Sequence, residues 1–206
     1  MLRGQIPLGA AMKRAGLLFL IVLGLLYPAL AQETYVLDPA HARIGFSVSH
    51  MGLFTTEGQF QRFDSQLAID PANPEHTTIS VRIDAASALV PSAEGEEMLR
   101  SPAYFDVGRY PDIRFRSTVI RARSRDDYAI QGDLEMRGVT RPVTLSARLV
   151  NRQRNAASGM ETVDFVVTGT VQRSEFGMVA DRSFVADEIA LNILARLQLP
   201  EPPHGK

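Results

Sequence analysis

Apolar residues recur at every second position through most of the chain between Tyr35 and Leu197, and the residues between them are polar, charged or glycine. Successive side chains of a β-strand point to opposite faces, so this period places the apolar residues of each segment on one face. The clearest case is Ile44-Gly45-Phe46-Ser47-Val48-Ser49-His50. The pattern predicts strands that are buried on one side, which is typical of an all-β antiparallel fold.

About eight such segments follow one another, separated by clusters of turn residues such as residues 70–74, 123–127 and 155–159. No stretch between them is long enough for recurrent crossover helices, which argues against a parallel α/β sheet. One segment differs, because Ser92 to Tyr104 holds good helix formers behind a serine cap. The sequence predicts one short helix there.

Alternation alone fits both a sandwich and a barrel. The apolar faces are long and rich in phenylalanine, and the chain has no tryptophan and no cysteine pair to mark an immunoglobulin-type core. We therefore expect an eight-stranded antiparallel barrel, whose interior has room for side chains or for one small ligand.

The first 31 residues differ from the rest and have the features of a secretory signal peptide. Arg3, Lys13 and Arg14 give a basic start, an apolar run covers residues 16–27, and residues 29–31 form a small-x-small cleavage pattern. The run is too short for an ordinary spanning helix, although an uncleaved anchor is the alternative. The sequence predicts a signal peptide over 1–31, one domain over 32–206 and export to the periplasm; translation from Met1 or from Met12 fits equally well.

Composition narrows the function classes. Removal of residues 1–31 takes away three basic residues and leaves 19 basic against 23 acidic, a net charge of about −4 with neutral histidines. This charge argues against nucleic acid as a partner. The chain contains no cysteine, and the remaining 175 residues are enough for one hydrophobic core without a disulfide.

Residues for catalysis or metal binding are few. His41 and His50 are nine positions apart along one predicted strand, so they cannot form a metal pair of the i, i+2 kind. No serine stands in a Gly-x-Ser-x-Gly setting and no glycine-rich loop opens a helix. The acidic cluster at residues 94–97 is explained by the first turn of the predicted helix. We expect no catalytic residues, no metal and no cofactor, and we place His50 at the edge of a pocket or in a structural hydrogen bond.

Seven blocks in order along the chain resemble the YceI-like family of exported polyisoprenoid-binding proteins. No single block is specific, but their order is. They cover nearly all of residues 35–197: Asp38 to His50, Gly58 to Phe63, Val81 to Ser87, Leu99 to Asp106, Tyr110 to Phe115, Gly132 to Val143 and Arg173 to Gly177. The chain differs from the usual pattern of the family at two places. Gly95 to Met98 stands where members commonly have an Arg-Asp-x-His-type segment, and Glu175 stands where they usually have an aspartate.

The resemblance implies a lipocalin-like barrel that holds a long isoprenoid or fatty chain, and an envelope location. We predict that the ligand contacts the apolar inner faces of the strands. The predicted ligand-binding residues are Phe46, Val48, His50, Phe60, Val81, Phe115, Ile130, Leu145, Phe165, Phe176 and Leu191. A homodimer and a transient membrane contact during lipid loading are further expectations without assigned residues.

Two other functions are the alternatives. A barrel filled by its own side chains would instead be a non-enzymatic stress-response or partner-binding module. A lipid isomerase or hydrolase would need a polar constellation that the sequence does not show.

Overall fold

The computed structural model describes residues 35–70, 73–156 and 160–198, all within one compact unit that spans Gln32–Lys206. The predicted signal peptide lies outside the described residues. None of the helices in the described ranges is long and apolar enough to cross a membrane.

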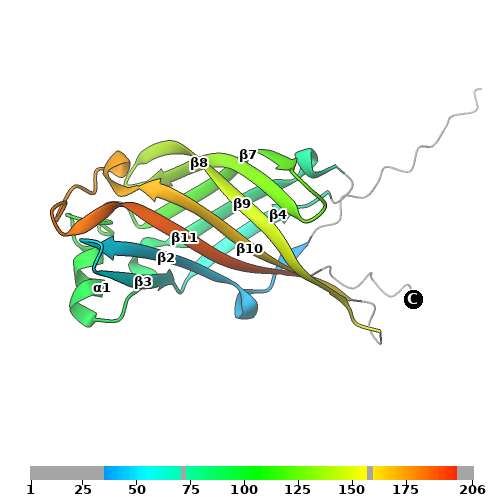
Figure 1. Cartoon of the computed structure of the whole chain (residues 1–206), viewed down its shortest axis with the longest axis horizontal. Coiled ribbons are helices and arrows are strands. Elements are labelled where there is room, and N and C mark those ends of the chain that lie inside the picture. Colours follow the sequence, from blue (N-terminus) through cyan, green and yellow to red (C-terminus); the bar gives the residue numbers. More distant parts are fainter. Residues whose placement is uncertain (1–34, 71–72, 157–159, 199–206) are drawn as a thin grey trace, which may run out of the picture. The chain divides into compact units, whose positions relative to one another are not determined.

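The unit is one antiparallel sheet with one α-helix and four short 3-10 helices (Figure 1). The strands are β1 Val36–Leu37, β2 Arg43–His50, β3 Phe54–Phe60, β4 Phe63–Ala68, β5 Thr78–Asp84, β6 Ala88–Leu89, β7 Asp112–Ala122, β8 Asp127–Met136, β9 Val139–Arg154, β10 Glu161–Gln172 and β11 Val185–Gln198. The helices are α1 Ala93–Arg100, η1 Pro39–His41, η2 Pro74–His76, η3 Ala85–Ser87 and η4 Arg173–Phe176.

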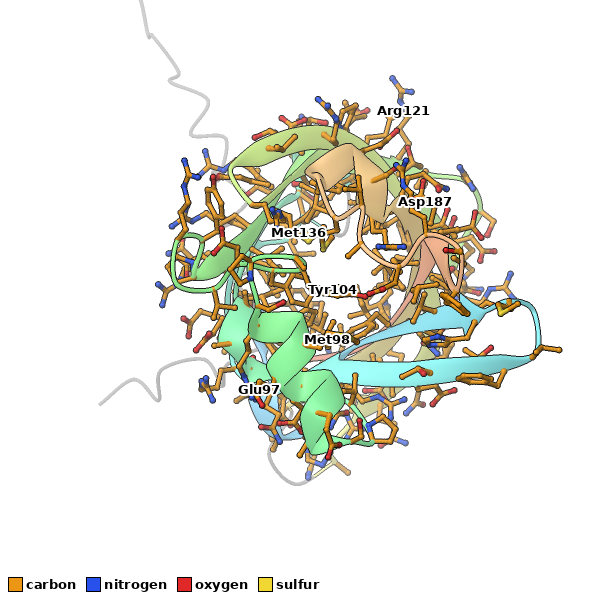
Figure 2. The ribbon with its side chains drawn as sticks, turned by 90° about the vertical axis from the view of Figure 1, so that its left-hand side faces the viewer. Glu97, Met98, Tyr104, Arg121, Met136 and Asp187 are labelled. Carbon is orange, nitrogen blue, oxygen red and sulfur yellow. The ribbon has the colours of Figure 1, made fainter. Side chains whose placement is uncertain are left out.

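The sheet returns on itself. Its strand order is β4-β5-β7-β8-β9-β10-β11-β2-β3-β6, with β1 added beside β11. The strands at the two ends of this order are connected along the chain. β4, at one end, directly follows β3, and β6, at the other end, follows β5. Backbone hydrogen bonds join these segments across their bends, from Gln61 to Ser87 and from Asp84 to Arg62. Viewed along its axis, the sheet surrounds a central opening (Figure 2).

The prediction of an all-β antiparallel fold with one short helix is confirmed, but the count of eight strands is wrong. Two long strands are each split at a bend, by residues 61–62 between β3 and β4 and by η3 between β5 and β6. The two-residue β1 adds a further strand. The bends do not interrupt the apolar pattern, since Phe60 and Phe63 on either side of the first bend both face the core.

The predicted helix is shorter than the segment assigned to it. Ser92 caps α1 by accepting a hydrogen bond from the Gly95 backbone N–H. The helix ends at Arg100 because Pro102 disfavours helical backbone at Ser101. A series of turns then leads into β7.

The barrel has two distinct ends. The helix end carries α1, the β2–β3 turn, the β8–β9 turn and the segment from η4 to β11, and it lies on the left in Figure 1. The opposite end carries η1, η2, the β7–β8 turn and the far part of the β9–β10 hairpin. Most buried apolar side chains form one cluster on the inner face between these ends.

Candidate functional site

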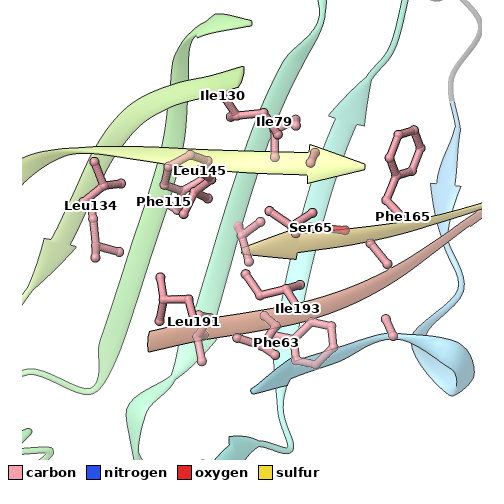
Figure 3. Close-up of a pocket in the computed structure, with 18 of the residues that line it drawn as sticks. Phe63, Ser65, Ile79, Phe115, Ile130, Leu134, Leu145, Phe165, Leu191 and Ile193 are labelled. Carbon is pink, nitrogen blue, oxygen red and sulfur yellow. The ribbon is translucent and has the colours of Figure 1, made fainter. Parts of the chain in front are cut away.

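An apolar cavity of about 350 Å³ runs inside the barrel. Residues that alternate along the strands form its wall, as the period-two pattern requires. Figure 3 shows Phe115, Ile130, Leu145, Leu191 and Ile193 from β7, β8, β9 and β11 pointing into this shared space. The volume lies within the range of roughly 300–1,000 Å³ of small-molecule pockets in proteins.

Glycines at inward positions shape the wall. Gly58 on β3 is paired with Phe46 on β2, and a Cβ at Gly58 would lie 2.3 Å from Cζ of the Phe46 ring. A Cβ at Gly132 on β8 would lie 2.5 Å from the Phe115 ring. Because these glycines have no side chain, the two rings lie flat over the neighbouring strand. The rings therefore cover the sheet and leave the centre of the barrel open.

Nine of the eleven residues predicted to bind ligand line this cavity. They are Phe46, Val48, Phe60, Val81, Phe115, Ile130, Leu145, Phe165 and Leu191. The alternation placed them on the inner face, and the curvature of the sheet brings these inner faces together. Their contact with a ligand stays a prediction.

His50 and Phe176 are absent from the cavity wall. His50 lies at the end of β2, where its Nε2 is 2.9 Å from Thr56 Oγ1 and its ring stacks on Phe54 at 4.6 Å. Phe176 is 1% exposed and lies in η4, whose helical turn takes it out of the alternating pattern. Its side chain packs in the core instead.

Sequence reasoning missed lining residues of two kinds. Some belong to the same alternating faces and could have been found from the period: Ile44, Ile79, Ile83, Ile113, Leu134, Met136, Val143, Val167, Val171, Ile189 and Ile193. Others come from loops and helices, where no period exists: Leu99, Tyr104, Phe105 and Met178.

Tyr104 borders the cavity at the helix end (Figure 2). Its hydroxyl donates a 2.6 Å hydrogen bond to Asp181, and Arg137 from the β8–β9 turn donates to the carbonyls of Pro102 and Tyr104. Burial and the Asp181 carboxylate raise the pKa of Tyr104 to about 12. Tyr104 is therefore neutral at physiological pH and joins three segments that are far apart in the chain.

Arg173 also borders the cavity at this end, and it is only 2% exposed. Its guanidinium donates to the carbonyls of Met178, Ala180, Val185 and Ala186 at 2.7–3.0 Å. These four carbonyls belong to the segment that leads from η4 into β11. Arg173 therefore fixes this segment around the helix end of the cavity.

At the opposite end the cavity wall includes Asp70, Thr77 and Arg152, whereas Ser65 on β4 lies in one row with Val81 and Phe115. The charged residues among the described wall residues are thus confined to the two ends, with Arg173 at one and Asp70 and Arg152 at the other. Between the ends the wall is apolar apart from the Ser65 hydroxyl, and it offers mainly apolar contact area. Such an arrangement suits a long apolar chain.

Within the described ranges, no three histidine, aspartate or glutamate side chains lie close enough together to hold a metal ion. No buried side-chain nitrogen or oxygen there lacks a hydrogen-bond partner. The Tyr104 hydroxyl and the Arg173 guanidinium at the helix end of the cavity are thus engaged in holding the structure.

Comparisons with known proteins agree with this architecture. The family model described as YceI-like domain matches residues 35–197. A UPF0312 protein from Pectobacterium atrosepticum is 31% identical over 163 residues, covering 79% of this chain and 84% of the relative. Protein YceI from Escherichia coli is 32% identical over 153 residues, covering 74% of this chain and 79% of the relative.

Solved structures show the same fold. Burkholderia cenocepacia BcnA superimposes with a TM-score of 0.70 at 25% identity, covering 78% of this chain and 99% of that one. A polyisoprenoid binding domain from Saccharophagus degradans superimposes with a TM-score of 0.59 at 15% identity, covering 81% and 99%. At that identity the second likeness concerns the fold alone.

Proposed function

This chain belongs to the YceI-like family, and on that premise we propose that it binds one long isoprenoid or similar amphiphilic lipid inside its barrel and transports or stores it in the periplasm. The observation that carries the proposal is the apolar cavity of about 350 Å³ along the barrel. A long prenyl chain is too apolar to cross an aqueous compartment unless a protein surface replaces the water around it.

The size of the hydrophobic effect supports a lipid of this kind. Each buried methylene-sized group contributes about 0.8 kcal/mol, so one isoprene unit offers roughly 3–4 kcal/mol before any losses. The summed burial free energy of several isoprene units would exceed any realistic binding free energy. The loss of conformational freedom of the lipid chain on binding offsets much of this gain. Binding should therefore depend on chain length and on cavity volume, and only weakly on salt.

A solved relative adds support at the level of the fold. The Saccharophagus degradans structure with the same architecture is described as a polyisoprenoid binding domain. The alternative function, a partner-binding or stress-response module, assumes a barrel filled by its own side chains. The apolar cavity argues against that alternative, because the Phe46 and Phe115 rings lie over Gly58 and Gly132 at the wall and leave about 350 Å³ inside the barrel unfilled.

The proposal includes no catalysis. At the helix end of the cavity, the polar groups of Tyr104 and Arg173 are engaged in structural contacts. Export to the periplasm is proposed from the signal-like residues 1–31.

The first test is native mass spectrometry, with organic extraction, of the protein purified after expression of the full chain in a bacterial host. We expect a stoichiometric isoprenoid or acyl lipid. A protein that carries no lipid and also refuses added octaprenyl lipid would overturn the proposal.

A charge inside the cavity should abolish lipid binding. Phe115 is 9% exposed and lines the wall, so Phe115→Asp would place a carboxylate against the hydrocarbon chain. The matched control is Thr118→Asp, an exposed position on the same strand. We expect extraction to recover lipid from the control and none from the Phe115 variant. Circular dichroism establishes that both are folded, and a folded Phe115→Asp protein with bound lipid would contradict the assignment.

A smaller change tests the shape of the cavity. Gly58→Ala should push the Phe46 ring away from the wall and into the cavity, since the new Cβ would lie within 3 Å of three ring carbons. Overpacking of this kind costs about 1–3 kcal/mol, so lipid affinity should fall by about tenfold or more. Gly108→Ala is the control, because nothing lies within 4 Å of a Cβ there. Equal affinities of the two variants for a prenyl alcohol in a fluorescence titration would exclude this role for Gly58.

A further inference from the structure

Exposed large apolar side chains gather at the helix end of the barrel. Among the described residues nine large apolar side chains are exposed, and the three outside this end are Val36, Val150 and Leu194. The other six, which we call the apolar rim, are 44–80% exposed: Met51, Leu53, Phe54, Met98, Val179 and Phe184.

The apolar rim comes from three segments. Its first part is the β2–β3 turn, where Met51 and Gly52 have positive φ and Leu53 is 80% exposed. The segment before β11 lies beside this turn, because the Met51 backbone N–H donates to the Phe184 carbonyl at 3.0 Å. The third segment is α1, on which Met98 lies near the central opening (Figure 2).

The apolar rim continues into the cavity. Three rim residues are direct neighbours in sequence of residues that line the cavity: Met98 precedes Leu99, Val179 follows Met178, and Phe184 precedes Val185. On each of these segments, one side chain points outward and the next points inward. An apolar path therefore connects the outer surface of the helix end with the interior of the barrel.

We infer that the apolar rim docks on the surface of a lipid bilayer and that lipid passes between the bilayer and the cavity along this path. The inference rests on the proposed lipid-carrying function and assigns one end of the barrel to loading. Exchange at a docked rim avoids exposure of the prenyl chain to water, which is the step that free diffusion makes slow.

A second copy of the chain fits this surface less well. The six stand on three separate segments, and the β2–β3 turn projects away from the central opening in Figure 2, so they do not form one flat face for a rigid partner. A fluid bilayer has no such difficulty, because acyl chains can fill the gaps between the segments.

Charge points to apolar contact as the source of binding. The segments that carry the rim hold acidic side chains beside the basic ones, with Glu94, Glu96 and Glu97 on α1 and Asp181 next to Arg182. A surface of mixed sign gains little from an anionic membrane. Docking should therefore occur on neutral lipid and persist at high salt.

Site-specific labelling gives a direct test. The chain has no cysteine, so Leu53→Cys adds a unique site for an environment-sensitive dye, and Val150→Cys adds a matched site that is exposed at the other end. Both proteins are made from the full chain. With neutral phosphatidylcholine vesicles, we expect a blue shift and quenching by lipid-borne quenchers for the dye at position 53 only. No response at position 53, or equal responses at both positions, overturns the inference.

Lipid transfer gives a second test. We expect Leu53→Asp/Phe184→Asp to take up a fluorescent prenyl alcohol from vesicles at least tenfold more slowly than wild type. Val36→Asp/Val150→Asp should load at the wild-type rate. Equal rates for the two double variants, or a concentration-dependent dimer that Leu53→Asp/Phe184→Asp abolishes, would overturn docking on a bilayer.

The two proposals fail in different ways. Prenyl alcohol delivered from a water-miscible solvent bypasses the membrane and reports on the cavity alone. Wild-type protein that binds lipid delivered this way but shows no vesicle contact would overturn the docking inference and leave the proposed function standing. Wild-type protein that binds no lipid by either route would overturn the proposed function.

Discussion

The two ends of the barrel are held together by different chemistry. At the helix end a buried arginine binds four backbone carbonyls, and a buried tyrosine binds Asp181. At the opposite end ion pairs on the surface join the strands, among them Arg196 with Asp164 and Arg154 with Glu161. The helix end also carries six of the nine exposed large apolar side chains of the described residues.

The helix end is therefore suited to contact with an apolar surface, and the opposite end is suited to contact with water. Exposed ion pairs keep a surface hydrated and contribute little to stability, at most about 1 kcal/mol each. Internal hydrogen bonds from Arg173 and Tyr104 hold the loops of the helix end from the inside, beside a surface ion pair between Arg100 and Glu96 on α1. The loops can thus expose apolar side chains and still keep a defined conformation.

Replacing Arg173 and Arg196 one at a time is the strongest test of this difference between the two ends. Arg173→Met leaves four carbonyls without their donor, so the free energy of unfolding should fall by about 3–5 kcal/mol. Arg196→Met removes an ion pair whose arginine is 32% exposed, and we expect a loss of about 1 kcal/mol or less. Urea denaturation of both variants measures the difference.

Equal losses for Arg173→Met and Arg196→Met would show that the two ends are held with similar strength. A lower m-value for Arg173→Met alone would instead indicate that the helix end has opened in the folded state. Hydrogen exchange in residues 177–184 separates these outcomes, because the carbonyls that Arg173 binds lie in or next to this segment.

Tyr104 tests the helix end with a single hydrogen bond. Tyr104→Phe should cost about 1.5 kcal/mol at neutral pH, because the bond to Asp181 involves a charged acceptor. The pKa of Tyr104 is raised from 10.0 to about 12, so its contribution is complete below pH 10 and is lost as the pH rises toward 12. Thermal unfolding between pH 8 and about 11 should show a steeper decline for wild type than for the variant. Parallel curves would contradict the pKa shift.

The sequence predicted the walls of the barrel better than its ends. Period-two alternation depends on the pleat of each strand alone, so residues such as Phe46 and Phe115 could be placed on the inner face before the fold was known. The glycine that accommodates each ring depends on the register between strands. Local alternation does not determine this register, and Gly58 and Gly132 were therefore not recognised as the positions that accommodate the Phe46 and Phe115 rings.

The contacts at the ends of the barrel could not be predicted from the sequence. They join residues that are distant in the chain and that follow no hydrophobic period. Tyr104 and Asp181 are 77 positions apart. The role of Arg173 depends on the path of the segment that returns to β11. Phe176 was placed with the ligand for a similar reason, since a pattern of strands does not show that η4 turns its side chain into the core.

One carboxylate at each end allows the smallest and most selective test. Hydrogen bonds from Ser174 lower the pKa of Asp187 at the helix end, and those from Arg196 lower the pKa of Asp164 at the opposite end. Because both pKa values lie below the ordinary value of an aspartate, each contribution is present above about pH 4 and is lost as the pH falls through the folded-state pKa. Both carboxylates are partly exposed, so solvent screens their interactions and we expect losses of about 1 kcal/mol or less for Asp187→Asn and Asp164→Asn at pH 7.

Salt should separate these two carboxylates. The Asp164 interaction is an ion pair, so about 0.5 M NaCl should reduce the cost of Asp164→Asn. The carboxylate of Asp187 accepts hydrogen bonds from the neutral hydroxyl and backbone N–H of Ser174, so the cost of Asp187→Asn should change little. Urea titrations at low and high salt measure both costs. If salt reduces them equally, the helix end depends on charge as much as the opposite end does, and the contrast between an end held internally and an end held by surface ion pairs is wrong.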